Sequence, residues 1–411
     1  MCAVQAAELP QATPESVGFS SQRLALLDPA MHAFVDDGAL AGIVALVTRH
    51  GKVVYFDAYG KRDIASDAPM RPDTIFRIYS MTKPVTAVAM MKLYELGKWY
   101  PDDPLSKYIP EFADLRVFAG VDDKGEMILE APNHAPTVGE LLTHTAGFTY
   151  GFGSTPVDEL YRQKNPLGAA NLQELIERLA AIPLLYQPGE RWEYSVSVDV
   201  QGYLVEKLSG RSLPDFMREQ IFEPLGMTDT GFAVPQAKLE RLATIYAPAP
   251  GGGGLAPQPR DPNVTEVPGL ASGGGGLYST ARDYARFAQM LANGGELDGA
   301  RILAPSTVDL MRANHLPAKL MDGRFGIGFQ RMRPGFGYGY DVAVYTDPHA
   351  AGSSTGEGTY LWDGAAGTWF WIDPMNDIVF VGMIQRMVTG GGMPNLQNLS
   401  RQLVQQALVE P

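Results

Sequence analysis

Short runs of β-branched and aromatic residues, separated by turn residues, occur near both ends of the chain. The stretch AGIVALVTRHGKVVYFDAYG (41–60) holds two such runs joined at RHGK, which predicts an antiparallel hairpin. After residue 324 the pattern returns in FGIGFQRM, DVAVYT, GTWFWID and DIVFVGMIQ, which predicts further short strands. Apolar spacing in residues 20–37 and in NLQNLSRQLVQQAL predicts a helix near each end of the chain.

The middle third has the spacing of amphipathic helices instead. In TVGELLTHTAG, Thr137 and Glu140 have the spacing of a capping box, which predicts a helix start. NLQELIERLAAIP, DVQGYLVEKLSG and SLPDFMREQIFEPLG follow with helical periodicity, and STARDYARFAQMLANGG predicts a capped helix after them. The Pro/Gly segment 246–263 between these helices either roofs a cleft or is a flexible crossing.

This order of elements predicts an α/β fold of the α+β type. We expect one antiparallel sheet built from both chain ends and flanked by the terminal helices, with a mostly helical lobe inserted between them. The predicted boundaries are 1–100 and 270–411 for the sheet lobe and 101–269 for the helical lobe.

Composition narrows the class of protein. The 411 residues carry a formal net charge of −13, which argues against nucleic acid or an anionic membrane as a partner. Cys2 is the single cysteine, so an intrachain disulfide is excluded. The N-terminus lacks the pattern of a signal peptide, and apolar runs long enough to span a membrane are absent, so we expect a soluble, cytoplasmic protein.

A serine and a lysine stand three residues apart where an apolar helix is predicted to begin. Ser80 and Lys83 lie in FRIYSMTKPVTAVAMMKLYELG, in which the helix runs from Met81 to about Leu96 and ends at Gly97. Residues three apart on a helix are neighbours, and the helix N-terminus together with burial lowers a lysine pKa. A neutral lysine can take the proton of a serine hydroxyl and so activate a nucleophile. The alternative is surface decoration, because S-x-x-K occurs by chance about once in a chain this long.

Two later segments offer further groups for such a reaction. Tyr194 follows a Pro-Gly turn and precedes a helix, so its hydroxyl can point into a cleft and protonate a leaving group; with 18 tyrosines, an ordinary packing role is the alternative. Asp199 either caps that helix or supports the site from behind. In LWDGAAGTWFWIDP, Trp362, Gly364 and Gly367 either pack at a strand edge or line a cleft whose backbone N–H holds an oxyanion.

Other catalytic patterns are weaker or missing. GSSTG (352–356) matches G-x-S-x-G, but in that arrangement a histidine follows the nucleophile, and the last histidine, His349, precedes Ser354. We therefore expect a loop there. His144, in LLTHTAG, is expected to be structural. The sequence lacks H-E-x-x-H, a clustered Cys/His set and a phosphate loop, so neither a metal nor a cofactor is expected.

The motifs SMTK, YSV and WDG, in this order, resemble the serine β-lactamase and penicillin-binding-protein superfamily, in particular its class C-like members. LLTHTAG and GGGGLYSTARDYARF are also similar to segments of these proteins, and the resemblance extends from about Ser20 to the C-terminal helix; family VIII carboxylesterases look most similar. The resemblance implies Ser80 as nucleophile, Lys83 as the neighbouring base and Tyr194 as acid and base for the leaving group, with the first proton acceptor left open. It also implies an oxyanion hole from the N–H groups of Ser80 and Ala365.

Two departures from β-lactamases bear on the substrate. Val196 stands where those enzymes have an asparagine, and Trp362-Asp363-Gly364 stands where they have K-T-G. A more apolar pocket without a cation suits a neutral ester with a short acyl chain, and we expect Trp362, Gly364 and Val196 to contact it. The alternatives are a β-lactamase or D,D-peptidase, an acyltransferase to an alcohol or amine, and a catalytically silent scaffold. The oligomeric state is not predicted.

Overall fold

The computed structural model describes residues 8–251, 253–321, 326–327, 330–331, 334–388 and 395–410. Its helices are α1 (Ser21–Leu24), α2 (Leu27–Asp36), α3 (Thr82–Glu95), α4 (Val138–Leu142), α5 (Pro156–Lys164), α6 (Leu172–Ala180), α7 (Ser197–Ser209), α8 (Leu213–Met217), α9 (Glu223–Leu225), α10 (Ala281–Ala292), α11 (Pro305–Arg312) and α12 (Leu396–Ala407). Its strands are β1 (Gly42–Arg49), β2 (Lys52–Asp63), β3 (Ala68–Pro69), β4 (Phe76–Arg77), β5 (Val117–Val121), β6 (Met127–Glu130), β7 (Tyr246–Pro248), β8 (Leu255–Pro257), β9 (Tyr278–Ser279), β10 (Glu296–Leu297), β11 (Ala300–Arg301), β12 (Gly326–Ile327), β13 (Gln330–Arg331), β14 (Phe336–Tyr338), β15 (Ala343–Tyr345), β16 (Tyr360–Asp363), β17 (Trp369–Asp373) and β18 (Ile378–Met383).

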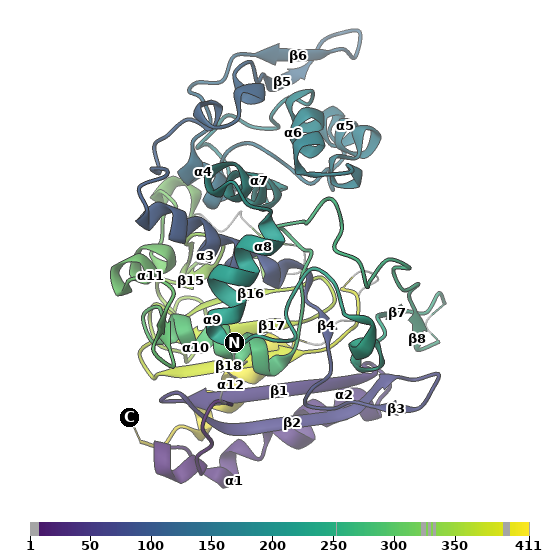
Figure 1. The fold of residues 1–411 in the computed structure, drawn as a ribbon, viewed down its shortest axis with the longest axis vertical. Coiled ribbons are helices and arrows are strands. Elements are labelled where there is room, and N and C mark those ends of the chain that lie inside the picture. The colour runs from purple at the N-terminus through teal and green to yellow at the C-terminus, as the bar shows by residue number, and fades with distance from the viewer. Residues whose placement is uncertain are drawn as a thin grey trace.

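An eight-stranded antiparallel sheet forms the lower half of the molecule (Figure 1). Its order is β14-β15-β16-β17-β18-β1-β2-β3, so strands from the two chain ends meet where β18 pairs with β1. The predicted hairpin is confirmed: β1 pairs with β2 across His50 and Gly51, which both have positive φ, 51° and 70°. Two successive residues with positive φ are typical of the tight turns that match strand twist. The predicted mixed α/β class with a large antiparallel sheet is confirmed.

Helices cover both faces of this sheet, and successive side chains of β17 point to opposite faces. The indole N–H groups of Trp369 and Trp371 both donate to Ser400 on α12 (3.2 and 3.1 Å). Phe370 points the opposite way and packs against Tyr284 of α10. The period of two along the strand thus places α12 on one face and α10 on the other. This explains why β17 and β18 read as continuous apolar runs and are buried throughout.

The middle of the chain lies above the sheet in Figure 1, where α4 to α7 gather beside the hairpin of β5 and β6. α4 begins with the predicted capping box between Thr137 and Glu140. α3 packs against α7, so the helix that follows Ser80 runs between the sheet and the upper helices. The predicted division into two lobes at residues 100 and 270 stays a prediction. Tyr246 on β7, in the predicted helical lobe, pairs with Arg386, which follows β18 in the predicted sheet lobe.

Three local expectations differ from the structure. The helix expected over residues 20–37 is two helices, α1 and α2, joined by a turn at 25–26. In FGIGFQRM the described residues form β12 and β13, which pair with each other and not with the main sheet; residues 325, 328, 329 and 332 of that run lie outside the described residues. The middle third also contains the pairs β5–β6 and β7–β8. Among the described residues, the helices are all too short or too polar to cross a membrane.

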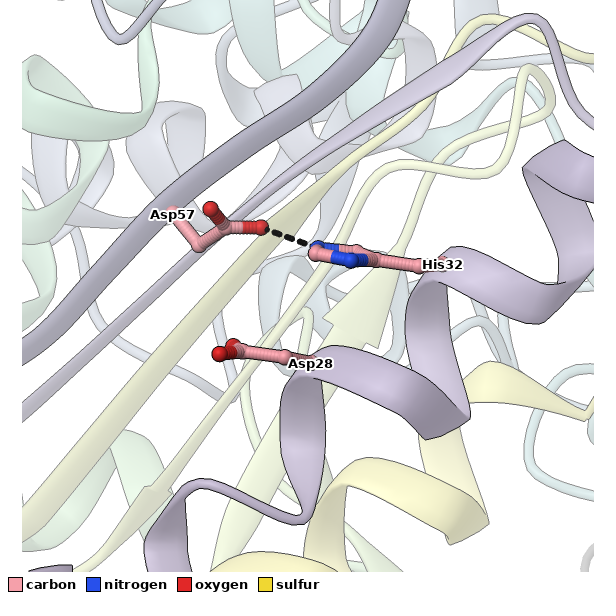
Figure 2. A group of neighbouring side chains, drawn as sticks. All are labelled: Asp28, His32 and Asp57. Atoms are coloured by element: carbon pink, nitrogen blue, oxygen red, sulfur yellow. Dashed lines mark hydrogen bonds and ion pairs between the residues drawn. The ribbon is translucent and has the colours of Figure 1, made fainter.

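On the outer side of β2, three side chains of types that can bind metals come together (Figure 2). His32 Nε2 on α2 lies 2.7 Å from Asp57 Oδ2 on β2, and the imidazole stacks on Tyr59 with ring centroids 3.7 Å apart. Asp28 accepts a hydrogen bond of 2.7 Å from the Tyr55 hydroxyl. Because each group already has a protein partner, we interpret this cluster as an ion pair and a hydrogen bond that join α2 to β2.

Candidate active site

Ser80 lies in a single 3₁₀ turn, 79–81, that leads directly into α3. The residue before it, Tyr79, has a φ of 43°, a conformation that is uncommon for a residue with a large side chain. Strained backbone of this kind is concentrated at functional sites, where the surrounding structure maintains it. The turn presents the Ser80 hydroxyl at the start of α3, and Lys83 follows in the first turn of that helix.

The Lys83 ammonium group is completely buried and is surrounded by oxygen atoms. Nζ donates to the Tyr150 hydroxyl (2.9 Å) and to the Gly274 carbonyl (2.7 Å), and it lies 3.5 Å from Ser80 Oγ. Burial lowers the pKa of Lys83 to about 8, although the negative charge of Asp199 acts in the opposite direction. A neutral amine would use its two N–H groups on Tyr150 and Gly274, which leaves its lone pair for the Ser80 proton.

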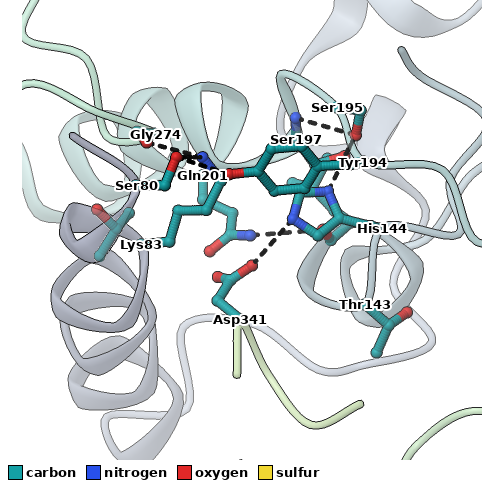
Figure 3. A network of polar contacts seen from close by, with 12 residues as sticks. Ser80, Lys83, Thr143, His144, Tyr194, Ser195, Ser197, Gln201, Gly274 and Asp341 are labelled. Carbon is teal, nitrogen blue, oxygen red and sulfur yellow. Dashed lines mark hydrogen bonds and ion pairs between the residues drawn. The ribbon is translucent and has the colours of Figure 1, made fainter. Parts of the chain in front are cut away.

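Tyr194 approaches Ser80 from the other side (Figure 3). Its hydroxyl donates to Ser80 Oγ at 2.7 Å, and Lys83 Nζ lies 4.7 Å from the centre of its ring. Burial raises the pKa of Tyr194 well above its usual range, with the hydrogen bond to Ser80 acting in the opposite direction. Tyr194 therefore holds its proton at neutral pH. The structure brings together Ser80, Lys83 and Tyr194, which lie up to 114 residues apart in sequence.

Asp199 does not cap α7, which was one of the two roles expected for it. It contacts the loop that binds Lys83, in line with the other expected role. It lies in the first turn of α7, and its Oδ1 accepts hydrogen bonds from the Ser272 hydroxyl and from the Gly274 N–H. Burial raises the pKa of Asp199, and the positive charge of Lys83 opposes this. Asp199 thus holds the glycine loop at 272–274, whose carbonyl at Gly274 receives the Lys83 N–H.

The third predicted motif lies against the Ser80 segment. Trp362, on β16, packs its ring 5.9 Å from that of Tyr194. In the turn after β16, the Thr368 hydroxyl donates to the Ile78 carbonyl, two residues before Ser80 (3.2 Å). The carbonyl of Ala365 accepts a hydrogen bond from the Val388 N–H (3.0 Å), which fixes the peptide plane of this turn. The turn that carries Ala365 therefore runs beside the turn that carries Ser80.

Two predicted features lie elsewhere. Val196 is buried in the core at the start of α7, and its expected contact with substrate stays a prediction. Ser354 and His349 are exposed on the loop between β15 and β16, as expected for a loop. Tyr150 and the Gly274 carbonyl, which accept hydrogen bonds from Lys83, were not predicted from the sequence. Tyr150 carries no distinguishing spacing, and a backbone carbonyl leaves no signature in residue type.

A family model described as Beta-lactamase matches residues 27–403. The chain belongs to this family. It is 38% identical to the protein Rv1367c of Mycobacterium tuberculosis, over 85% of this chain and 87% of that protein. It is 34% identical to esterase EstB of Burkholderia gladioli, over 84% and 86%. The structure of EstCE1, described as a hydrolase with promiscuous acyltransferase activity, superposes with a TM-score of 0.75 at 27% identity and covers 95% of this chain and 99% of that one.

In this member of the beta-lactamase family a cavity of about 390 Å³ adjoins the Ser80 segment. Its wall includes Tyr79, next to Ser80, and Met387, next to the Val388 that holds Ala365. Gln258 and Asp261, in the Pro/Gly segment 246–263, close another side. A volume of this size lies in the range of small-molecule sites. The segment therefore lines a cavity that reaches Tyr79, the residue before the candidate nucleophile, while Ser80 is not part of the cavity wall.

Proposed function

We propose that the protein is a carboxylesterase that cleaves short-chain esters through an acyl-enzyme on Ser80. The observation that carries this proposal is the placement of Ser80 Oγ between the Tyr194 hydroxyl at 2.7 Å and the buried Lys83 amine at 3.5 Å. A serine hydroxyl becomes a nucleophile when a positioned base takes its proton. The esterase EstB and the hydrolase EstCE1, to which the chain is similar over most of its length, support this proposal.

Acylation begins when neutral Lys83 takes the Ser80 proton as Ser80 Oγ attacks the ester carbonyl carbon. The N–H groups of Ser80 and Ala365 hold the oxyanion, a role in which one donor contributes roughly 2.7–4 kcal/mol to transition-state stabilisation. When the tetrahedral intermediate collapses, Tyr194 gives its proton to the departing alcohol oxygen. The raised pKa of Tyr194 keeps its proton in place until the more basic departing alkoxide takes it, and the lowered pKa of Lys83, about 8, lies near the operating pH of a general base. We therefore assign the first proton transfer to Lys83.

Deacylation uses the same groups in reverse. The ammonium form of Lys83 returns its proton to Tyr194, since both groups adjoin Ser80 Oγ. A water molecule then loses a proton to this pair as it attacks the acyl carbonyl, and Ser80 leaves with a proton as the free hydroxyl. The products are an alcohol and a carboxylic acid, and the enzyme is regenerated without a cofactor.

The surroundings of Ser80 favour a neutral substrate group near the third motif. Trp362, which packs on Tyr194 and is 3% exposed, stands where β-lactamases of this type carry the lysine of K-T-G. An antibiotic carboxylate would lack that cation here. We infer that one substituent of the ester lies against Trp362 and Tyr194 and that the cavity beside Tyr79 accepts the other.

Hydrolysis of p-nitrophenyl butyrate is expected, with an initial burst of p-nitrophenol equal to the enzyme concentration if deacylation is the slower step. The assay compares p-nitrophenyl esters of acetate, butyrate, octanoate and palmitate, and we expect kcat/KM to be highest for the short acids. Nitrocefin in parallel tests the β-lactamase alternative. Rapid nitrocefin cleavage with slow ester cleavage would favour that alternative, and inertness toward every substrate would favour a silent scaffold.

The acyltransferase alternative has a specific basis, because EstCE1 is described as having both activities. Adding a primary alcohol to the butyrate assay distinguishes the two outcomes through the ratio of butyrate ester to free butyric acid. A rate that depends on the alcohol, with little free acid, would indicate a transferase. A small-molecule partner, a cytoplasmic location and the absence of nucleic-acid or membrane partners stay predictions, which cell fractionation and binding assays can test.

Gly364→Ala is expected to damage the site more than the fold. A Cβ at Gly364 would collide with the Ile78 carbonyl oxygen and the Thr368 hydroxyl, which separates the turn of Ala365 from that of Ser80. Misplacement of about 1 Å can lower kcat/KM by about 10²-fold, and overpacking costs about 1–3 kcal/mol of stability. Ester kinetics and thermal unfolding measure the two effects. Gly231→Ala, where a Cβ meets its nearest neighbour at 3.8 Å, is the control.

A further inference from the structure

His144 lies beside the ring of Tyr194 and has no place in the mechanism above (Figure 3). It follows α4, is 1% exposed and has a φ of 56°, in the left-handed region. Left-handed backbone at a residue other than glycine costs of the order of 1–3 kcal/mol and persists where neighbouring structure enforces it. A buried, strained histidine next to a site calls for a physical explanation.

Three contacts of His144 converge on one short segment. Its carbonyl accepts the Glu193 N–H at 2.9 Å, and its Nδ1 lies 3.1 Å from Ser195 Oγ. Its imidazole packs on the ring of Tyr194, with centroids 5.1 Å apart. His144 therefore contacts Glu193, Tyr194 and Ser195, through its carbonyl group or its imidazole. Residues 191–195 belong to neither a helix nor a strand, so regular backbone hydrogen bonds do not hold them.

Asp341 holds the far side of the imidazole. It comes from the turn between β14 and β15, and its Oδ1 lies 3.8 Å from His144 Nε2, with both side chains completely buried. Asp341 also has a left-handed φ, 57°, and its N–H donates to the Leu142 carbonyl on α4 (3.1 Å). The strained pair thus joins the sheet to the helix that precedes His144.

Burial favours the neutral form of both side chains in this pair. Burial lowers the pKa of His144 well below its usual range, and the charge of Lys83 acts in the same direction. Burial raises the pKa of Asp341 well above its usual range, opposed by Gln201 and Lys83. The Asp341 carboxyl contacts Nε2 at 3.8 Å without a hydrogen bond, and either the imidazole Nδ1 or the Ser195 hydroxyl is the donor of the hydrogen bond between those two groups.

We propose that His144 is a positioning residue: it fixes residues 193–195 so that the Tyr194 hydroxyl stays on Ser80, and Asp341 fixes the imidazole. The inference rests on the proposed esterase function and on Tyr194 as the acid for the leaving alcohol. His144 thus affects the protonation of the leaving alcohol through Tyr194, although it does not contact the substrate.

The test compares two butyrate esters that form the same acyl-enzyme but release different alcohols. p-Nitrophenolate departs without protonation, whereas ethoxide requires a proton from Tyr194. We expect His144→Ala to lower kcat/KM for ethyl butyrate by about 10²-fold and for p-nitrophenyl butyrate by less than about tenfold. Because both substrates are measured on one preparation, the ratio of the two values does not depend on the fraction of enzyme that is folded.

Matched variants complete the design. His144→Asn retains a side-chain amide near the position of Nδ1, which can donate or accept a hydrogen bond, and it tolerates left-handed backbone, so it should recover most of the ratio. His50→Ala removes another left-handed histidine that faces an aspartate, Asp377, on an exposed hairpin, and it should leave the ratio unchanged. Tyr194→Phe should change the ratio in the same direction as His144→Ala.

An equal loss with both esters in His144→Ala would overturn the inference, because a purely structural role affects both substrates alike. A ratio unchanged in Tyr194→Phe would also overturn it, since His144 would then have no acid to position. In both cases the wild type would still cleave esters and the proposed function would stand. Failure of the wild type to cleave either ester would instead remove the proposed function.

Discussion

Ser80→Ala is expected to lower ester hydrolysis by roughly 10⁴-fold or more, since residues of a nucleophile–base group act as a unit and loss of the nucleophile removes the whole path. Alanine has no side-chain oxygen to attack the ester carbonyl carbon, while Lys83 and Tyr194 remain in place. Lys83 keeps its hydrogen bonds to Tyr150 and Gly274, and Tyr194 keeps its ring contacts with His144 and Trp362, so the variant should stay folded. The measurement is kcat/KM for p-nitrophenyl butyrate, together with mass spectrometry of the protein quenched during turnover.

Ser354→Ala is the matched control, because Ser354 stands in the one G-x-S-x-G match of the chain and is exposed on a loop. The butyryl adduct should appear on the peptide that contains Ser80 in the wild type and in Ser354→Ala, and it should be missing in Ser80→Ala. Full activity in Ser80→Ala with loss in Ser354→Ala would reverse the assignment and remove the role proposed for Lys83.

Local patterns identified the elements that carry the chemistry. The hairpin of β1 and β2 follows from two β-rich runs joined by residues suited to a tight turn, and α3 follows from an apolar helix that stops at Gly97. Ser80 and Lys83 could be paired from sequence because they belong to one helical turn. The turn and the helix around Tyr194 made it a candidate, and the motif resemblance paired it with Ser80, to which no local pattern links it across 114 residues.

Contacts between distant segments were beyond such patterns. Tyr150 and Gly274 reach Lys83 from two loops whose residue types indicate only turns. The imidazole of His144 contacts Asp341, which lies nearly two hundred residues later. Both residues adopt left-handed backbone conformations that no sequence pattern predicts. The break between α1 and α2 was missed because the apolar spacing continues across it, while β12 and β13 pair locally because strand-forming residues do not specify a partner.

Lys83→Arg is expected to lower kcat/KM by about 10²–10⁴-fold, the usual contribution of a general base. Arginine keeps the positive charge and can still donate hydrogen bonds, but it stays protonated at any pH at which the enzyme is folded and cannot accept the Ser80 proton. The wild type should also depend on pH in a defined direction. Burial lowers the pKa of Lys83 to about 8, so the ammonium form dominates below this pH and the amine above it.

Activity of the wild type should therefore rise as pH increases through about 8 and then level off, and this rise should be lost in Lys83→Arg. Lys92→Arg is the control: Lys92 lies on the same helix, burial lowers its pKa too, and it donates to the Ile302 carbonyl far from Ser80. It should keep the wild-type profile. A rise that persists in Lys83→Arg would assign the titration to another group, and substantial activity in that variant would make Tyr194 the first proton acceptor, with Lys83 acting only through its charge.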